Sequence, residues 1–517
     1  MKRKALCVSV ALILLTVTVY SVAGATNHLT STPTKGAPHA PEQSMKTSDW
    51  QQIAKIQKSN PAEQDIFGYS VGISGDYVVV GEGNNGLYGN AYIFTRDGTT
   101  WVQQAELNAS DPSLGKNFGD SVAINGDTAV IGAPGDNQWT GAAYIFTRAG
   151  TTWTQQAKLT ADDGAIEDEF GFSVALSGDT AVIGASYAGN GWTGQAYVFT
   201  RSGTTWTEQT ELLASDGGPE DQFGWSVAVS GNTAVVGSVY DDGRTGSAYV
   251  YTRTGTTWTE QQKLTASDAA LEDAFGASVS IDGNTTVIGA GWKDTFMGAA
   301  YVYTRSGTTW TQQAKINASD GGNGDEFGTA VSISGDKVVV GARFVSVWTG
   351  AAYIFSRTGT TWTQEQRINA SDGAYFDQFA WSVGIDHNYV ICGAPNDPKP
   401  NVGSAYIFMK PIPKEPVLNI TIKSGRGIEV TVSNTGNANA TNVNVTISLQ
   451  GGLIFLGKLT SAHYPNLGVN QTVFAKPKTV LGFGRTTITA TATCDEGSSA
   501  EANATGFVFL IFVLGVN

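Results

Sequence analysis

The sequence predicts an all-β protein in which a seven-bladed β-propeller is followed by a small β-sandwich. The main observation is a segment that occurs seven times between residues 48 and 411, at a period of 51 to 53 residues. Such a period is typical of solenoids, propellers and arrays. Each copy also divides into four short strands, and four antiparallel strands per copy are what a propeller blade requires.

Every copy begins with Phe-Gly, or with Phe-Ala in the last copy. The phenylalanines are Phe67, Phe118, Phe170, Phe223, Phe275, Phe327 and Phe379. The first and second strands that follow are joined by Ser-Gly, Asn-Gly or Asp-Gly in the first six copies. These pairs tolerate the positive φ of a two-residue hairpin turn. A third strand of the AYIF type and a fourth strand of the TTWTQQ type complete the copy.

The last copy lacks a fourth strand, because it stops at AYIFMKP (405–411). A matching segment, SDWQQIAKI, stands at the other end of the repeats, at residues 48–56. We therefore expect residues 48–57 to complete the last blade, since a closed ring removes the two sheet edges that an open array exposes. The alternative is that Trp50 only caps an open array.

The Phe-Gly pair and an Ile-Gly-Ala-Pro motif resemble the FG-GAP repeat family, whose repeats also form the propeller of integrin α subunits. The likeness is clearest in Phe118-Gly119 with Ile131-Gly132-Ala133-Pro134, and in Phe379 with Cys392-Gly393-Ala394-Pro395. It covers residues 48–411 and implies a propeller. Integrin repeats place an Asp-rich calcium loop between the first two strands, whereas this chain has SGD, NGD or DGN there. One carboxylate cannot supply the roughly six to eight oxygens that calcium takes, so we expect neither calcium nor another cofactor at these turns.

The N-terminal residues are typical of an exported protein. MKRK is followed by an apolar run from Ala5 to Tyr20 and by Ala-Gly-Ala, which matches a signal peptide at residues 1–25. The run is shorter than a membrane span requires, so we expect no transmembrane helix in the mature chain. Residues 26–47 are rich in Thr, Ser and Pro, which predicts a flexible tether. The predicted location is extracellular or at the cell surface.

A second domain is predicted at residues 412–517. The runs LNITIK, GIEVTVSN, TNVNVTISL and RTTITATAT are separated by Gly, Asn and Pro clusters, which indicates a small β-sandwich. The segment VTVSNTGNANATNVNVTISL resembles the CARDB cell-adhesion-related module, and this resemblance implies an Ig-like fold. We interpret the final GFVFLIFVLGVN as the last strand, with a short membrane-contacting tail as the alternative. Cys392 and Cys494 fall in different domains, so no disulfide is expected.

The composition argues against some partners. With 31 Lys and Arg against 45 Asp and Glu, the net charge is −14, which is unfavourable for binding a nucleic acid or an anionic membrane. Asn-x-Ser/Thr sequons are possible N-glycosylation sites in an exported chain. They occur at Asn108, Asn284, Asn317, Asn369, Asn419, Asn439, Asn444, Asn470 and Asn503.

The copies differ mainly in the links between their second and third strands. Because adjacent strands alternate in direction, these links emerge on the same face as the links from each fourth strand to the next blade; we call it the top face. Loops with aromatic and Arg residues on a rigid scaffold are typical of binding surfaces. The candidate ligand-binding residues are Tyr88, Tyr187, Tyr240, Asp241, Asp242, Arg244, Trp292, Lys293, Asp294, Phe296, Arg343 and Phe344. For the repeated Trp139, Trp192 and Trp348, packing against the neighbouring blade is an equal alternative.

An Asp also recurs two residues before the Phe of most copies. The set is Asp65, Asp168, Asp221, Asp273, Asp325 and Asp377, with Lys116 in the second copy. Two interpretations are open: the carboxylates ring the channel mouth and bind a cation, or each Asp closes its own turn by accepting hydrogen bonds from backbone N–H groups. The second is the commoner use of a repeated Asp, so no firm metal site is predicted.

An enzyme is one alternative function. TRDGTTW at residues 95–101 is similar to the Asp box of sialidases, but Asp97 has no Asp counterpart in the other copies. The recurrent arginines are expected on the opposite, bottom face, where they cannot converge on one substrate: Arg96, Arg148, Arg201, Arg253, Arg305 and Arg357. The propeller segment contains one His, His387, which leaves no metal cluster or nucleophile–base pair.

The sequence therefore predicts an exported cell-surface or secreted adhesion protein, not an enzyme, that recognises a protein or a glycan through the variable top-face loops. The alternatives are a glycosidase-like propeller hydrolase and a purely structural protein of the cell envelope. Since one fold hosts many functions, the propeller by itself does not choose among them.

Overall fold

The computed structural model describes residues 49–83, 88–98, 100–397, 402–411, 415–424, 428–456, 459–476 and 480–509. The predicted signal peptide (1–25) and tether (26–47) lie outside these residues. Within the described part of the chain, no helix is long and apolar enough to cross a membrane.

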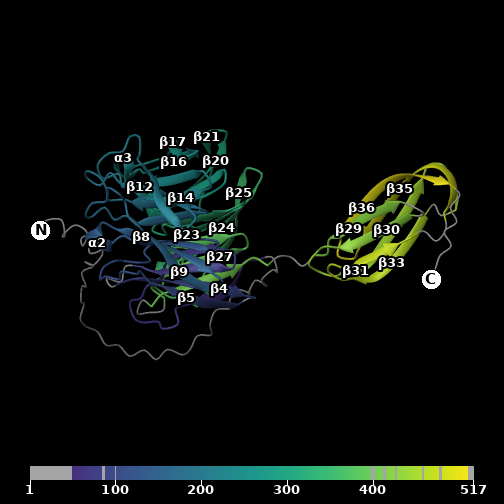
Figure 1. Ribbon diagram of the computed structural model, residues 1–517, viewed down its shortest axis with the longest axis horizontal. Helices are drawn as coiled ribbons and strands as arrows, with labels where there is room; N and C mark the ends of the chain where they lie inside the picture. The colour runs from purple at the N-terminus through teal and green to yellow at the C-terminus, as the bar shows by residue number, and fades with distance from the viewer. Residues whose placement is uncertain are drawn as a thin grey trace, which may run out of the picture. The chain divides into compact units, whose positions relative to one another are not determined.

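Seven four-stranded antiparallel sheets form a seven-bladed propeller (Figure 1). The first strands are β2 (Phe67–Ser74), β6 (Val122–Asn125), β10 (Ser173–Ser177), β14 (Phe223–Ser230), β18 (Phe275–Asp282), β22 (Ala330–Ser334) and β26 (Val383–Asp386). The second strands are β3 (Tyr77–Glu82), β7 (Thr128–Ala133), β11 (Thr180–Ala185), β15 (Thr233–Ser238), β19 (Thr285–Ala290), β23 (Lys337–Ala342) and β27 (Tyr389–Ala394). The third strands are β4 (Asn90–Asp97), β8 (Ala142–Ala149), β12 (Gln195–Ser202), β16 (Ser247–Thr254), β20 (Ala299–Ser306), β24 (Ala351–Thr358) and β28 (Ser404–Met409). The fourth strands are β5 (Thr100–Leu107), β9 (Thr152–Leu159), β13 (Thr205–Leu212), β17 (Thr257–Leu264), β21 (Thr309–Ile316), β25 (Thr361–Ile368) and, for the last blade, β1 (Gln51–Ile56).

The first strand of each blade is the innermost. Residues from all seven first strands, such as Ile73, Ile124 and Leu176, line a central channel. The second strands are buried between neighbouring sheets: Val130 of β7 shares an apolar core with Val174 and Leu176 of the next blade. β-branched residues fit such a pleated, buried surface, which explains the TAVIGA pattern.

Two glycines explain the repeated motifs. Gly119 has a φ of 98°, which other residues adopt only under strain. Gly132 lies so close to the next blade that a Cβ atom there would collide with the carbonyl oxygen of Gly171. The Phe-Gly and Ile-Gly pairs are therefore required by a turn and by blade packing. In the last copy Ala380 occupies the glycine position with a φ of 67°.

The repeated aromatic residues pack within and between blades. Phe118 is buried, and its ring centroid lies 5.4 Å from that of Tyr144 and 6.1 Å from that of Phe146. On the outer strands, Trp153 Nε1 donates to Gln104 Oε1 of the preceding blade at 2.9 Å. Equivalent bonds are made by Trp206, Trp258, Trp310 and Trp362. The TTWTQQ strand thus carries both partners of a blade-to-blade bond.

The strand β1 is the outer strand of the last blade. It pairs antiparallel with β28, with Ile56 opposite Ala405, and the sheet has the order β1-β28-β27-β26. Trp50 Nε1 donates to Glu365 Oε1 of the sixth blade at 3.2 Å. The two ends of the repeat region therefore meet in one sheet, which closes the ring.

The repeated arginines are engaged at the bottom of the blades. Arg148 forms an ion pair with Asp127, in the turn between β6 and β7. Arg305 donates to Asn284 Oδ1 at 2.7 Å, and its guanidinium lies 5.3 Å from the Trp310 ring centroid. These arginines hold first-to-second turns in place.

The C-terminal residues form two antiparallel sheets that share one apolar core. The first contains β29 (Leu418–Ser424), β30 (Ile428–Asn434) and β34 (Thr472–Ala475). The second contains β31 (Ala440–Gln450), β32 (Leu453–Leu456), β33 (Leu459–Leu467), β35 (Leu481–Thr493) and β36 (Ser499–Phe509). Val432 of the first sheet and Ile447 and Ile488 of the second are buried in the common core.

The last strand overlaps the predicted segment and begins earlier. GFVFLIFVLGVN (506–517) was expected to form it; β36 includes residues 506–509 of that segment but begins at Ser499, which pairs with Thr493 of β35. The segment SAEANAT was overlooked because its alternating alanines give a weaker period-two signal than a run of large apolar residues. Residues 510–517 lie outside the described residues. Cys392 is buried and Cys494 partly buried, and both are free thiols.

Candidate functional site

The top-face links are tied to the next blade by their backbone. Phe170 N donates to Thr140 O at 3.0 Å, and Glu169 N donates to Trp139 O at 2.8 Å. Equivalent bonds join Phe223 to Thr193, Phe275 to Thr245, Phe327 to Met297, and Phe379 to Thr349. The Trp-Thr-Gly backbone therefore joins neighbouring blades. The Trp139 side chain is nevertheless 40% exposed.

Four of the second-to-third links contain a left-handed turn. The turns are α2 (Asp136–Trp139), α3 (Asp241–Arg244), α4 (Lys293–Phe296) and α5 (Val345–Trp348), and the last three residues of each have positive φ. Even the β-branched Thr295 (φ 61°, ψ 50°) and Val347 (φ 60°, ψ 51°) adopt this backbone. It costs about 1 to 2 kcal/mol per residue. Such strain persists only where the surrounding structure fixes it, so these links are rigid.

The residue that follows each Phe-Gly pair lies at the top end of the innermost strand, close in sequence to the residues that line the channel. Its backbone N–H closes a turn, as in Phe172 N donating to Glu169 O at 3.0 Å, and it leads directly into the innermost strand. We call these residues the inner ring: Tyr69, Asp120, Phe172, Trp225, Ala277, Thr329 and Trp381. They are not among the residues that the sequence predicted for binding. Their variability next to the repeated Phe-Gly motif was the signal that could have identified them.

Aromatic side chains form a continuous run over blades three to five, which we call the first arc. Its members are Phe172, Tyr187, Trp192, Trp225, Tyr240, Trp292 and Phe296. Ring centroids lie 4.8 Å apart for Phe172 and Trp225, 5.9 Å for Trp225 and Tyr240, and 6.0 Å for Tyr240 and Trp292. The guanidinium of Arg244 lies 5.3 Å from the Tyr240 centroid. Inner-ring and link residues are thus joined into one surface.

A second arc covers blades six, seven and one. Its members are Tyr69, Arg343, Phe344, Trp348, Phe376 and Trp381. The Arg343 guanidinium lies 4.4 Å from the Trp381 ring centroid and 4.8 Å from that of Phe344. It also forms an ion pair with Glu326 at 2.7 Å. Arg343 is therefore held in a fixed position among aromatic rings.

Between the two arcs, blade two contributes a carboxyl group to the inner ring. Oδ1 of Asp120 is buried and has no hydrogen-bond partner among the described residues. Burial and the charge of Glu169 raise the pKa of Asp120 well above its usual range. Burial, together with the charge of Glu167, raises the pKa of Glu169 to about 7. Two acidic groups that resist ionisation therefore lie near each other at this edge of the channel, a feature that is common at functional sites.

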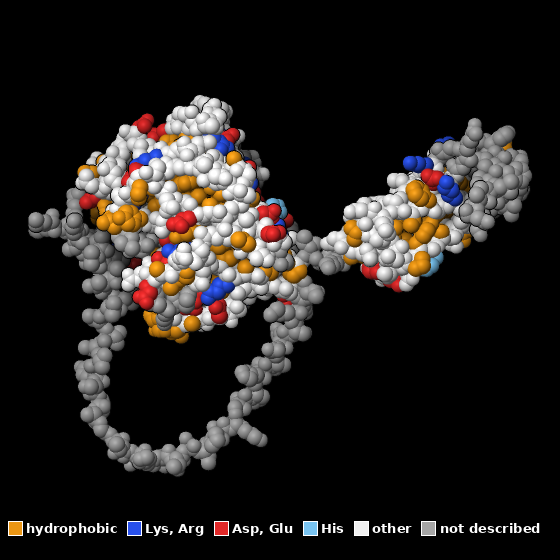
Figure 2. Space-filling view, turned by 60° about the horizontal axis from the view of Figure 1, so that its bottom comes forward, with side chains coloured by type: hydrophobic (Ala, Val, Ile, Leu, Met, Phe, Trp, Pro, Cys, Tyr) orange, Lys and Arg blue, Asp and Glu red, His pale blue; other side chains and the backbone are white. Residues whose placement is uncertain are grey.

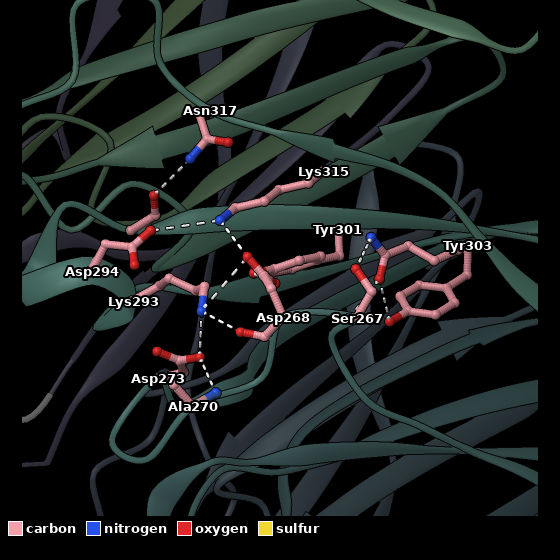
Figure 3. A network of polar contacts seen from close by, with 12 residues as sticks. Ser267, Asp268, Ala270, Asp273, Lys293, Asp294, Tyr301, Tyr303, Lys315 and Asn317 are labelled. Carbon is pink, nitrogen blue, oxygen red and sulfur yellow. Dashed lines mark hydrogen bonds and ion pairs between the residues drawn. The ribbon is translucent and has the colours of Figure 1, made fainter.

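Two candidate ligand-binding residues are instead buried in ion pairs. Asp241 is 3% exposed and lies 2.7 Å from Lys263 of the neighbouring strand. Lys293 is 3% exposed and lies 2.7 Å from Asp273 (Figure 3). Both lie in variable links, and the sequence alone does not show which side chains of a link turn inward, so the prediction that Asp241 and Lys293 contact a ligand is wrong.

The remaining candidates are at least partly exposed. Tyr88 is 49% and Phe296 46% exposed, and Asp242, Arg244 and Asp294 lie on the surface of their turns. The partly buried candidates Tyr187, Tyr240, Trp292, Arg343 and Phe344 belong to the two arcs. On the face of the propeller in Figure 2, apolar side chains gather in patches with acidic and basic side chains between them.

A charge exchange explains why Lys116 interrupts the repeated Asp set. In blade two, Lys116 is buried and pairs at 2.6 Å with Asp136, the first residue of α2. In blade five, Asp273 occupies the position of Lys116, and Lys293 occupies that of Asp136. The same ion pair is therefore built with its two charges exchanged.

Each of these pairs belongs to a network that recurs around the ring. In blade five, Tyr301 donates to Asp268 Oδ1 at 2.7 Å, and Lys315 lies 2.7 Å from Asp268 (Figure 3). Equivalent Tyr–Asp bonds are Tyr144–Asp111, Tyr197–Asp163, Tyr249–Asp216 and Tyr406–Asp372. These aspartates were not among the residues predicted to be important, although their recurrence in Ala-Ser-Asp or Ala-Asp-Asp is visible in the sequence. In these five blades they tie the entry loop to the third strand.

The repeated Asp before the Phe-Gly pair closes its own turn. Asp168 Oδ2 accepts from Ala165 N at 2.6 Å, and Asp325 Oδ2 accepts from Gly322 N at 2.6 Å. The same bond is made by Asp65, Asp221, Asp273 and Asp377. In the described ranges, no group of three or more Asp, Glu, His or Cys residues is placed to hold a metal ion. The Asn of every predicted sequon is exposed.

Comparison with known proteins assigns the repeats to a family. The model of the FG-GAP repeat matches residues 50–94, 101–146, 153–199, 206–251, 258–303, 310–355 and 362–408. Each match runs from the Trp of one blade's fourth strand to the third strand of the next blade, and the first begins at Trp50, directly before β1. No curated protein matches the chain. Since the family model covers more than half of the sequence and the seven sheets agree with it, the chain belongs to the FG-GAP repeat family.

Proposed function

We propose that this chain is an exported, cell-surface or secreted binding protein whose propeller recognises a protein or a glycan through its top face. The observation that carries the proposal is the pair of aromatic arcs. Solvent-accessible aromatic and Arg side chains on a rigid scaffold dominate the energetics of binding surfaces. On the bottom face, the aromatic contacts of the described residues are separate pairs, Tyr77 with Trp153 and Trp101 with Tyr389, and the repeated arginines are engaged with their own turns.

The remaining parts of the chain fit this role. Residues 1–25 have the pattern of a signal peptide, which supports export. We interpret the C-terminal sheets as a CARDB-like, Ig-like module that acts as a spacer. The exposed sequons would accept glycans in a host that attaches them. Adhesion is thus a function to which every segment can contribute.

A second candidate, a glycosidase-like hydrolase, is favoured by one observation. Asp120 and Glu169 are neighbouring acids with raised pKa values at the channel mouth, and glycoside hydrolysis uses a pair of carboxyl groups of which one stays protonated. We rank it second because only this pair favours it, whereas the two aromatic arcs extend over six blades. Release of reducing ends from oligosaccharides, abolished by Glu169→Gln, would reverse this ranking.

The proposal is tested by screening the purified full chain against immobilised glycans and cell-surface proteins. With a binder in hand, Trp292→Ala or Arg244→Ala should weaken binding by about 1 to 4 kcal/mol, the range for aromatic and Arg hot spots. Arg148→Ala and Arg305→Ala, on the bottom face, are the controls and should bind normally. Loss of binding in the bottom-face variants alone, with thermal unfolding unchanged, would place the functional surface elsewhere.

A further inference from the structure

We propose that the top face binds a neutral oligosaccharide, whose pyranose rings stack on the first arc while its hydroxyl groups bond to polar groups of the Phe-Gly turns. This inference rests on the proposed binding function and specifies the ligand class. It starts from polar atoms that the protein leaves without partners on the Phe-Gly turns.

Four side chains on the Phe-Gly turns contain a buried N or O atom that has no hydrogen-bond partner among the described residues. They are Asn117 Nδ2, Asp120 Oδ1, Gln222 Oε1 and Thr329 Oγ1. Asn117 and Gln222 are only 2% and 5% exposed. Buried polar groups are nearly always hydrogen-bonded, so each exception requires an explanation. They recur on the same turn in blades two, four and six, while the other eight such atoms of the described residues lie on other elements.

Two other blades satisfy the equivalent positions internally. Glu326, the residue before Phe327, accepts from Arg343 at 2.7 and 2.9 Å. Gln378, the residue before Phe379, accepts from Asn396. The turn itself is therefore compatible with fully bonded side chains. In blades two and four, the missing partners are a property of Asn117 and Gln222.

The unpartnered atoms favour a ligand that both donates and accepts hydrogen bonds. Asn117 Nδ2 is a donor, Gln222 Oε1 is an acceptor, and the Thr329 hydroxyl is both. A charged ligand of either sign would meet charges of its own sign, because Arg244 and Arg343 lie on the same face as the carboxylates of Asp242 and Asp294. Sugar hydroxyls, which are donors and acceptors at once, match this mixture.

The aromatic arc accounts for the apolar part of the recognition. Phe172, Trp225, Tyr240 and Trp292 follow one another at centroid distances of 4.8 to 6.0 Å. The faces of aromatic rings are electronegative, so they attract the C–H groups that cover one side of a pyranose ring. Because the arc extends over three blades, it offers successive rings to a chain of sugars rather than a single pocket to one monosaccharide.

The test uses the purified full chain on immobilised oligosaccharides of glucose, mannose, galactose and N-acetylglucosamine, beside amine-bearing and sulfated glycans. We expect the chain to bind one of the neutral oligosaccharides. This binding should persist when the salt concentration is raised to about 1 M, because charge interactions are then screened beyond ~3 Å. Tyr240→Ala and Trp292→Ala should each weaken it at least about tenfold. Thr329→Val, which removes only the hydroxyl, should weaken it about threefold or more.

Tyr389→Ala is the matched control, since Tyr389 also contacts one Trp ring and one Arg but on the bottom face. It should bind like the unmodified chain. Binding only to charged glycans, loss of binding in salt, or equal weakening by Tyr389→Ala would overturn the inference. If no glycan binds but a protein partner does, and Trp292→Ala impairs it, the oligosaccharide inference falls while the proposed function stands. If variants of both arcs bind every identified partner normally, the oligosaccharide inference and the proposed function are both wrong.

Discussion

The exchange of charge between blades two and five is a property of single residues. Lys116 with Asp136, and Lys293 with Asp273, are buried ion pairs at equivalent positions. Each has a further Lys and Asp beside it: Lys158 and Asp111 in blade two, Lys315 and Asp268 in blade five. Each pair has no net charge, whichever of its two positions carries the Lys. The same buried site can therefore accommodate both arrangements.

This arrangement predicts a rescue. Lys116→Asp leaves two carboxylates facing each other in a buried site and should destabilise the fold by about 3 to 5 kcal/mol, the range for breaking a buried pair. Adding Asp136→Lys recreates the orientation of blade five and should recover at least half of the loss. Urea unfolding of the single and double variants measures both steps. Additive destabilisation in the double variant would contradict the exchange.

Glu169 predicts a pH dependence. Its folded-state pKa of about 7 lies above the ordinary value of 4.5, so the native state holds this proton more tightly than the unfolded state does. The contribution of Glu169 to stability is therefore full below about pH 4.5 and is lost as the pH rises through 7. Glu169→Gln removes this loss. As the pH rises from 4 to 8, the free energy of unfolding of Glu169→Gln should increase by about 1 to 3 kcal/mol relative to that of the unmodified chain. A difference between the two proteins that stays the same at every pH would contradict this prediction.

Individual roles were predictable only where a residue repeats. Because they recur in the copies, structural roles could be expected for the Asp before the Phe-Gly pair, for the Phe itself and for the Gly of the second strand. By contrast, Asp241 and Lys293 were grouped with surface residues, because a variable link does not reveal which side chain turns inward. The inner-ring residues, such as Trp225, were overlooked because their significance depends on standing next to the channel, which is a property of the closed ring.

At the scale of elements, the strands follow from the sequence and the links do not. Alternating apolar residues and Gly turns define all four strands of a blade. The links GDNQWTG, YDDGRTG, WKDTFMG and FVSVWTG have little sequence in common, yet each forms a left-handed turn. No local preference predicts this conformation for Thr or Val. It is imposed by the backbone bonds to the next blade.

The left-handed turns predict an unusual stabilisation. Val347 is 67% exposed at a φ of 60°, and blade four has Gly243 at the equivalent position. Val347→Gly should therefore stabilise the protein by about 0.5 to 1 kcal/mol, since relief of strain exceeds the entropic cost of glycine.

Val102 is the matched control for this substitution. It is an exposed Val in the strand β5, where glycine is unfavourable, so Val102→Gly should destabilise the protein by about 0.5 to 1 kcal/mol. Chemical unfolding of both variants decides the matter. A loss of stability in Val347→Gly equal to that in Val102→Gly would show that the turn is not strained.

For the whole molecule, closure of the ring was predictable because a strand missing at one end of the repeats is present at the other. Removing residues 48–57 deletes β1, which pairs with β28 and contacts the sixth blade through Trp50. We expect a lower melting temperature and loss of cooperativity for the entire propeller, because the deletion leaves two sheet edges exposed where the ring was closed. Thermal unfolding identical to that of the full chain would contradict closure.

The location of function on the top face is the central claim, and one comparison tests it most directly. A triple variant with Trp225, Tyr240 and Trp292 changed to Ala is compared with a triple variant with Arg148, Arg253 and Arg305 changed to Ala, on immobilised oligosaccharides and cell-surface proteins, after both are shown to be folded. The account predicts that the first loses binding at least about a hundredfold while the second binds like the unmodified chain. Normal binding by the first variant and loss of binding by the second would contradict it.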